Sequence, residues 1–181
     1  MLDLIIRNGK CYIDGELNEV DVSIKDKKIH QIGQISEEAK ETIDASGHTV
    51  LPGCIDTQTH FREPGSTDTE DLHSGSRAAI AGGITSVFEM PNTNPPTSNK
   101  KEFQRKLDLA KNRMYCNYAF YFGATADNAD DLASLKDLEG CCGIKLFAGS
   151  STGNLLVAEE DDIDKVFQNA SKVVAVHSED E

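Results

Sequence analysis

The stretch IDTQTHFREPG, residues 55–65, decides the fold. It follows a Leu-Pro-Gly turn signal, begins as an apolar run and ends in a dense polar cluster. If its first part is a strand, alternate side chains share one face, so Asp56, Gln58 and His60 point the same way. Arg62 then lies at or just past the end of the strand on that face. Such a polar face is unsuited to a hydrophobic core and well suited to line a binding site for a polar ligand or a metal.

Downstream of this stretch, strand-like runs alternate with helix-like runs. The predicted strands cover residues 54–60, 84–90, 116–122, 143–147 and 172–177. The predicted helices cover about 70–81, 98–113, 128–137 and 159–170, supported by Ser98 as an N-cap, acids at 159–162 and a Gly82-Gly83 C-cap. This alternation implies parallel strands with right-handed crossovers. Because a complete eight-stranded barrel takes about 250 residues, the alternatives are an open five-stranded sheet and an incomplete barrel.

Residues 2–50 read as a separate, β-rich unit, so we place a domain boundary between residues 51 and 52. Short strand-like runs occur at 2–7, 11–13, 20–24, 29–32, 42–45 and 49–50. The Asn8-Gly9 turn signal predicts that the first two runs form a hairpin. The expectation is a small antiparallel sheet with little core of its own.

Charge and composition exclude several classes of partner. A net charge of −13 over 181 residues argues against nucleic acid and against an anionic membrane surface, because both need a basic footprint. An anionic small substrate stays possible if a local arginine receives it. We find no signal peptide and no membrane-spanning apolar run. The five cysteines show no C-x-x-C spacing, which favours reduced thiols in a cytoplasmic protein.

Polar residues mark the C-terminal ends of the predicted strands, which is where α/β barrels and open α/β sheets build their sites. His60 ends the first strand and His177 the last, while Lys145 lies inside an otherwise apolar strand. Such a lysine either snorkels to the surface or is kept neutral by burial, so that it can react or be modified. A carbon dioxide adduct would turn it into a carboxylate able to bridge metals. Either histidine alone would be an ordinary core or rim residue; together they favour a shared cation.

Arg62 and Asn92 are the candidate ligand-binding residues. Arginine suits bidentate capture of a carboxylate, although a plain surface ion pair is the alternative. Asn92 lies in the proline-stiffened loop 90–96, where it either caps a turn or hydrogen-bonds a substrate. Three other histidines are expected at the surface: His30, His48 and His73.

Four blocks of sequence together resemble the class I dihydroorotases of the amidohydrolase superfamily. They are LPGCIDTQTHFREPG (51–65), DLHSGSRAAIAGGITSVFEMPNTNP (71–95), GIKLFAGSSTGNLL (143–156) and VHSEDE (176–181). The resemblance implies a distorted (β/α)8 barrel plus a β-sandwich built from both chain ends. It also implies reversible hydrolysis of dihydroorotate to N-carbamoyl-L-aspartate in pyrimidine biosynthesis.

The resemblance further implies one or two zinc ions at the barrel mouth, which supply hydroxide at neutral pH. Lys145 matches the carboxylated lysine that bridges the metals, and His60 and His177 match histidine ligands. The family's first strand-one histidine is Gln58 here, and an amide oxygen binds zinc more weakly than imidazole does. This departure puts one of the two ions in doubt.

Arg62 and Asn92 match the family residues that hold the substrate carboxylate. The family's general-base aspartate would lie beyond Glu181, so no catalytic base is predicted within this chain. We therefore expect about five βα steps of the barrel, residues 52–181, after the first part of the sandwich, residues 1–51. On this interpretation the chain is an N-terminal fragment, and the isolated 181 residues are expected to be inactive.

Two other functions are compatible with the same residues. One is a non-catalytic pseudo-dihydroorotase scaffold that accompanies aspartate transcarbamoylase, which Gln58 favours and the retained His60, Lys145 and His177 oppose. The other is a different cyclic amidase, of the dihydropyrimidinase or allantoinase type. The expected partners are a small anionic substrate and either a second copy of the chain or aspartate transcarbamoylase.

Overall fold

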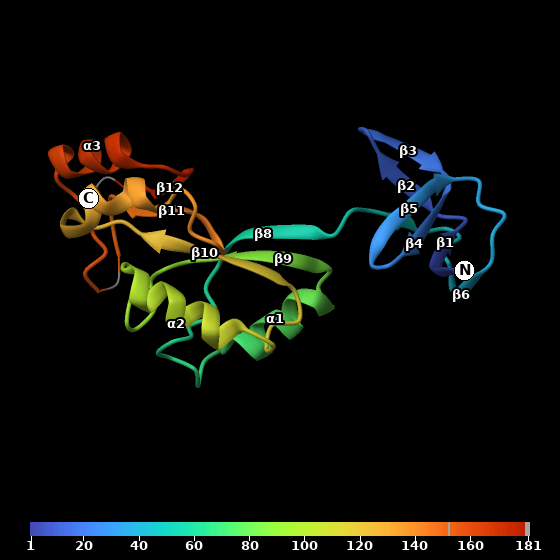
Figure 1. Cartoon of the computed structure of the whole chain (residues 1–181), viewed down its shortest axis with the longest axis horizontal. Helices are drawn as coiled ribbons and strands as arrows, with labels where there is room; N and C mark the ends of the chain where they lie inside the picture. Colours follow the sequence, from blue (N-terminus) through green and yellow to red (C-terminus); the bar gives the residue numbers. More distant parts are fainter. Residues whose placement is uncertain (152, 180–181) are drawn as a thin grey trace. The chain divides into compact units, whose positions relative to one another are not determined.

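The computed structural model describes residues 1–151 and 153–179 (Figure 1). Thr152 of the Gly/Ser-rich loop and the closing Asp180 and Glu181 lie outside the described residues. The chain divides into two compact units, Met1–Pro52 and Gly53–Glu181. Within the described ranges, no helix is long and apolar enough to cross a membrane.

The first unit contains two small sheets in which parallel and antiparallel pairs are mixed. One sheet has the order β5-β4-β1-β6 and the other has the order β3-β2-β7. Their strands are β1 (Leu2–Arg7), β2 (Lys10–Ile13), β3 (Glu16–Glu19), β4 (Asp21–Lys25), β5 (Lys28–Gly33), β6 (Ala39–Asp44) and β7 (Thr49–Val50). The β1–β6 and β2–β7 pairs are parallel. The prediction of one antiparallel sheet is therefore wrong.

The predicted hairpin between the first two runs is also wrong, because β2 pairs with β3 instead of β1. Asp14 and Gly15 both have positive φ angles, 51° and 91°, as a two-residue type I′ hairpin turn requires. Sequence reasoning missed β3 because Glu-Leu-Asn-Glu has a single apolar residue and shows no alternation. β3 is a strand because it pairs with β2, and not because of its own sequence pattern.

The second unit is built on a parallel sheet with the order β12-β11-β10-β9-β8. Its strands are β8 (Cys54–Thr59), β9 (Ile84–Glu89), β10 (Asn117–Gly123), β11 (Cys141–Phe147) and β12 (Val174–His177). Its helices are α1 (Leu72–Ala81), α2 (Lys100–Ala110), the 3-10 helix η1 (Ala126–Leu135) and α3 (Glu160–Asn169). The five predicted strands and the parallel arrangement are confirmed, with small shifts at the ends.

Two helix starts differ from the prediction. Helix α2 is capped by Asn99, whose side chain accepts a hydrogen bond of 2.9 Å from the Glu102 N–H, and not by Ser98. The helix expected at 128–137 is the 3-10 helix η1, which Thr125 caps two residues earlier than expected. The Gly82 C-cap of α1 is confirmed: its N–H donates to the Ala78 carbonyl.

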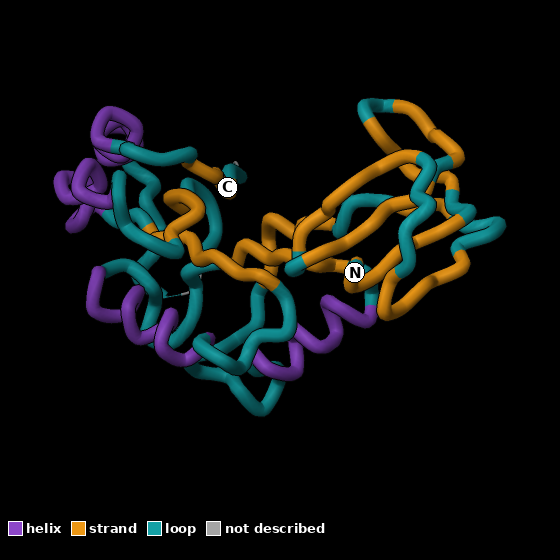
Figure 2. Tube along the Cα trace, turned by 45° about the vertical axis from the view of Figure 1, so that its right-hand side comes forward, coloured by secondary structure: helices purple, strands orange, loops and turns teal. Residues whose placement is uncertain are grey.

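The core of the second unit lies between the sheet and its helices. Phe103 of α2 packs against Phe120 and Phe122 of β10, with ring centroids 6.4 and 6.2 Å apart. Figure 2 shows the helices in purple gathered on one side of the orange strands of this unit. The edge strand β8 is exposed at every residue except Thr59, and Ile55 is 57% exposed.

A buried ion pair between Glu89 and Lys106 lies in this core. Glu89 ends β9 and Lys106 belongs to α2, and their exposed fractions are 1% and 0%. Burial raises the pKa of the Glu89 carboxyl to about 7, although the Lys106 ammonium opposes that rise. Burial lowers the pKa of Lys106. Burial therefore disfavours the charged form of both side chains, and their mutual attraction offsets only part of that effect.

The raised pKa of Glu89 predicts how stability depends on pH. Between the ordinary carboxyl value of 4.5 and about 7, the folded protein binds more protons than the unfolded one. The free energy of unfolding should therefore fall as pH rises through this window, by as much as about 3 kcal/mol. In Glu89→Gln this fall should disappear. Urea unfolding of both proteins at pH 5 and pH 7.5 measures it, and an equal fall in the variant would contradict the assignment.

Candidate active site

The four predicted metal ligands come together in one open hollow of about 310 Å³. Gln58, His60, Lys145 and His177 line it, at or near the C-terminal ends of β8, β11 and β12. Parallel strands bring their carboxyl ends to one edge of a sheet, so residues far apart in sequence meet there. Asn92, from the loop after β9, lines the same hollow.

Lys145 is buried, with 3% of the residue exposed, so the snorkelling interpretation is wrong. Its Nζ lies 5.1 Å from the centroid of the Phe147 ring. Among the described residues no carboxylate pairs with it. Burial lowers the pKa of this amine. A larger fraction of neutral amine follows, and the neutral amine is the form that can add to carbon dioxide.

His60 is half-buried, and its orientation is set by Asn92. The ring Nδ1 lies 2.9 Å from Asn92 Oδ1, so Nδ1–H donates to the amide oxygen. Burial lowers the pKa of this imidazole, which favours the neutral ring. With the proton on Nδ1, the Nε2 lone pair is available to a cation, which is the usual arrangement of a metal-binding histidine.

His177 presents a nitrogen that lacks a hydrogen bond. Its Nε2 is buried, and no described residue makes a hydrogen bond to it, although Glu179 Oε1 lies 3.1 Å away.

The donor set of this hollow fits a divalent metal only if Lys145 contributes. Two imidazoles and a nearby carboxylate are borderline ligands of the kind that zinc takes. Within residues 1–151 and 153–179, no three His, Cys, Asp or Glu side chains are grouped closely enough to hold a metal. A carboxylated Lys145 would complete the set, because it lies between the two histidines in the same hollow.

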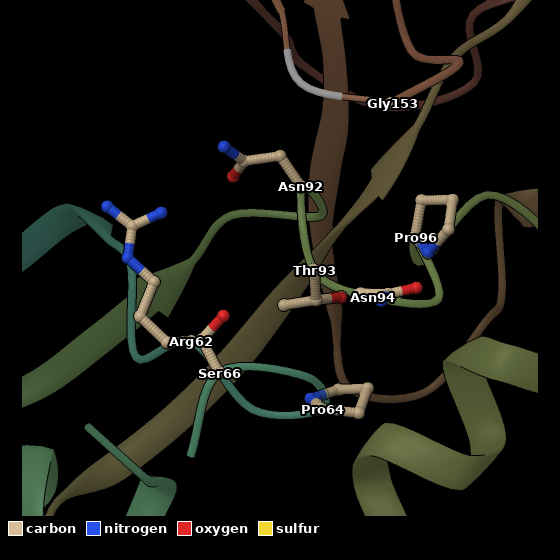
Figure 3. Close-up of a pocket in the computed structure, with 8 residues that line it drawn as sticks. All are labelled: Arg62, Pro64, Ser66, Asn92, Thr93, Asn94, Pro96 and Gly153. Carbon is tan, nitrogen blue, oxygen red and sulfur yellow. The ribbon is translucent and has the colours of Figure 1, made fainter. Parts of the chain in front are cut away.

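A second open hollow, of about 450 Å³, adjoins the first and shares Asn92 with it. Figure 3 shows the Arg62 guanidinium and the Asn92 amide turned toward the same open space. Arg62 has a φ angle of 59°, so the chain leaves the strand direction there. It therefore does not continue the face of Gln58 and His60, as the alternation predicted; the turn places it in the neighbouring hollow.

The remaining sequence candidates lie apart from both hollows. Asp56 is exposed and accepts a hydrogen bond of 2.9 Å from the Gln58 N–H, which turns its carboxylate to the backbone. His30 and His48 are exposed, as predicted. His73 is half-buried, and its ring contacts Tyr115 edge to face at 5.2 Å.

Sequence reasoning missed the charged residues that support the site. Lys106 follows Phe103 by three positions and precedes Ala110 by four, so it shares the buried face of α2. That periodicity was readable in the sequence and marks Lys106 as a buried cation in need of a partner. The ion pair of Glu63 with Arg113, 50 residues apart, has no such local signal.

The parallel sheet with its polar cluster at the strand ends defines a partial α/β barrel protein whose site lies at the carboxyl edge. Residues 49–177 match the sequence profile of the Amidohydrolase family, and the chain belongs to this family. The predicted fold class is confirmed: an α/β chain with the N-terminal portion of a TIM-like barrel and a small β-sandwich domain. Members of this superfamily are generally metal-dependent.

Relatives with three different names resemble the chain. It is 35% identical to the dihydroorotase of Methanosarcina mazei over 185 residues, which is 100% of this chain and 40% of that protein. It is 40% identical to an allantoinase of Escherichia coli over 149 residues, 82% of this chain and 33% of that protein. The L-hydantoinase (dihydropyrimidinase) from Arthrobacter aurescens superposes with a TM-score of 0.91 at 30% identity, covering 100% of this chain and 42% of that one. The chain thus spans about two fifths of these proteins, or less.

Proposed function

We propose that the chain carries part of the active site of a dihydroorotase, which hydrolyses the ring amide of dihydroorotate reversibly to N-carbamoyl-L-aspartate. The supporting observation is the pair of adjoining hollows that share Asn92. One holds Arg62, and the other holds His60, Lys145 and His177. Dihydroorotate carries a carboxylate on the ring that is opened, so a carboxylate-binding arginine beside a hydrolytic centre suits it.

On this proposal His60, His177 and a carboxylated Lys145 hold zinc, with Gln58 as a weaker fourth donor. Such a metal, when bound, lowers the pKa of water and polarises a carbonyl group. The neutral Lys145 amine adds to carbon dioxide and releases one proton, which leaves a carbamate in place of the buried amine. Asn92 keeps the proton of His60 on Nδ1 through its Oδ1.

The substrate would be oriented by the second hollow. Arg62 presents a planar donor fork that pairs with a carboxylate through two parallel hydrogen bonds. With its Oδ1 taken by His60, Asn92 offers its Nδ2 protons, for which the described part of the chain provides no acceptor. A cyclic amide held by its carboxylate at Arg62 would thus place its ring near the histidines.

Substrate profiling tests this proposal directly. We expect the natural gene product, supplied with zinc, to hydrolyse dihydroorotate with a kcat/KM at least about 100-fold above that for hydantoin or allantoin, since those rings lack the carboxylate. A preference for allantoin or hydantoin would instead assign the chain to a different cyclic amidase. The identity of 40% to an allantoinase makes that the second candidate.

The non-catalytic scaffold is the third candidate, and Gln58 is the residue that favours it. Metal analysis separates it from an enzyme: a scaffold would contain no zinc and no added mass at Lys145.

We propose a cytoplasmic protein, since all five cysteines are free thiols in the structure. A second copy of the chain or aspartate transcarbamoylase stays the proposed partner.

A further inference from the structure

The loop that carries Arg62 is anchored by its neighbour, Glu63. This carboxylate is buried, with 6% of the residue exposed. Its two oxygens accept hydrogen bonds from Arg113, Nη1 to Oε1 at 2.8 Å and Nη2 to Oε2 at 3.1 Å. Oε2 also accepts from the Leu72 N–H at 2.9 Å, at the start of α1. Glu63 therefore ties the loop both to the start of α1 and to Arg113, which lies three residues after the end of α2.

This anchor matters because Arg62 has an unusual backbone conformation. Its φ angle of 59° lies in the left-handed region, which is unfavourable for a residue with a Cβ atom. Such a conformation persists when the surrounding contacts impose it. Phe61 before it and Glu63 after it are both buried, so the chain is held on each side of Arg62 while its own side chain is exposed.

The loop that carries Asn92 is anchored from α2 itself, which ends three residues before Arg113. Lys106 of α2 forms the buried ion pair with Glu89, and its Nζ donates to the Met90 carbonyl at 2.9 Å. The Met90 N–H in turn donates to Thr59, the residue before His60, at 2.9 Å. One lysine thus fixes the end of β9, and Asn92 follows three residues after that end.

The two loops are also joined to each other. The Asn94 N–H donates to the Pro64 carbonyl at 2.9 Å. Gly65 lies so close that a Cβ atom there would stand 3.0 Å from the Asn94 Cβ and 3.2 Å from the Asn94 backbone. A displacement of one loop is therefore passed to the other.

We infer that α2 and the residues directly after it form one support for both ligand-binding loops, with Arg113 positioning Arg62 through Glu63 and Lys106 positioning Asn92 through Glu89 and Met90. The inference rests on the proposed function of Arg62 and Asn92. Lys106 and Arg113 are positioning residues, because they act through other side chains and line neither hollow. The Arg113–Glu63 contact, the first arm of this support, affects only the hollow that holds Arg62. The contacts of Lys106 with Glu89 and Met90, the second arm, affect Asn92, which lines both hollows.

Arg113→Met tests the first arm, with Arg105→Met as a matched control. Arg105 lies on α2 itself and likewise pairs with a glutamate, Glu102, but that pair is exposed. In the natural gene product we expect Arg113→Met to raise the KM for dihydroorotate between about tenfold and 100-fold, because a small misplacement of a positioned group has effects of that size. Metal content should not change. Arg105→Met should alter neither quantity, and Arg113→Lys should give an intermediate KM.

Glu89→Gln combined with Lys106→Met tests the second arm without leaving a buried charge unpaired. Here we expect both a raised KM and a weaker metal affinity, because Asn92 also orients His60. Lower thermal stability with unchanged KM and metal affinity in both variants would show a merely structural role and would overturn the inference.

A readout that needs no substrate separates this inference from the proposed function. The side-chain Nε NMR signal of Arg62, assigned by its loss in Arg62→Lys, should be single and dispersed in the natural protein. We expect it to broaden or move to the random-coil position in Arg113→Met and to stay in place in Arg105→Met. An unchanged signal would contradict the inference. A shifted signal in a protein that does not hydrolyse dihydroorotate would support the positioning role and overturn only the proposed substrate.

Discussion

Replacing Lys145 by methionine should remove bound metal and lower kcat/KM at least about 1,000-fold. If Lys145 is a metal ligand as proposed, its loss should raise the activation barrier by several kcal/mol, and each 1.36 kcal/mol is a factor of ten. Methionine keeps the length and the apolar stem of the lysine, so packing against Phe147 should be retained. Elemental analysis of the purified protein measures the metal, and a full complement of metal in the variant would contradict the ligand role.

The same variant tests the carbamate. Growth with 13C-labelled bicarbonate should give one carbamate carbon signal in the natural protein and none in Lys145→Met. Lys165→Met is a suitable control, because Lys165 is half-buried outside both hollows and pairs with the exposed Asp130. It should keep the signal, the metal and the activity. The pKa of Lys145 is lowered by burial, so lowering the pH of a metal-free sample should protonate the amine and release the carbon dioxide.

Replacing Arg62 by methionine should raise the KM for dihydroorotate about 100-fold. Two charge-assisted hydrogen bonds to the substrate carboxylate are lost, which amounts to about 3 kcal/mol. Hydantoin carries no carboxylate, so its hydrolysis should change less than about threefold on the same principle. Arg62→Lys should give an intermediate KM, because the charge is kept and the fork is lost. Steady-state kinetics with both substrates measure this, and an equal loss for hydantoin would show that Arg62 has a different role.

Local sequence patterns predicted the elements of the second unit because the periodicity and capping residues of each element are visible within its own sequence. The run Gly-Ile-Lys-Leu-Phe predicts a buried strand whatever surrounds it, and Lys145 is conspicuous there as the one charged residue. The Gly82 C-cap and the acids in the first turn of α3 are similarly local signals. The start of α2 was misplaced by one residue because Ser98 and Asn99 are both good caps, and only the hydrogen bond to Glu102 distinguishes them.

Patterns failed where long-range pairing decides the structure. β3 is a strand because β2 folds back on it through the Asp14-Gly15 turn. Arg113 lies 50 residues from Glu63, and nothing near either residue in sequence indicates that they form two hydrogen bonds. Lys106 is the intermediate case, since helical periodicity places it on the buried face but does not identify Glu89 as its partner.

The sequence by itself determined the order of strands and helices in the second unit, the family and the residues with unusual chemistry: His60, Lys145 and His177 in or after strands, and Arg62 and Asn92 in the loops. Those features depend on local periodicity and residue type. Only the tertiary structure decided that the residues occupy two hollows instead of one face, and that Asn92 belongs to both. The reason is the left-handed turn at Arg62, which the contacts of the buried Glu63 with the start of α1 and with Arg113 stabilise. Arg113 lies 50 residues away, so no neighbouring residue could indicate that contact.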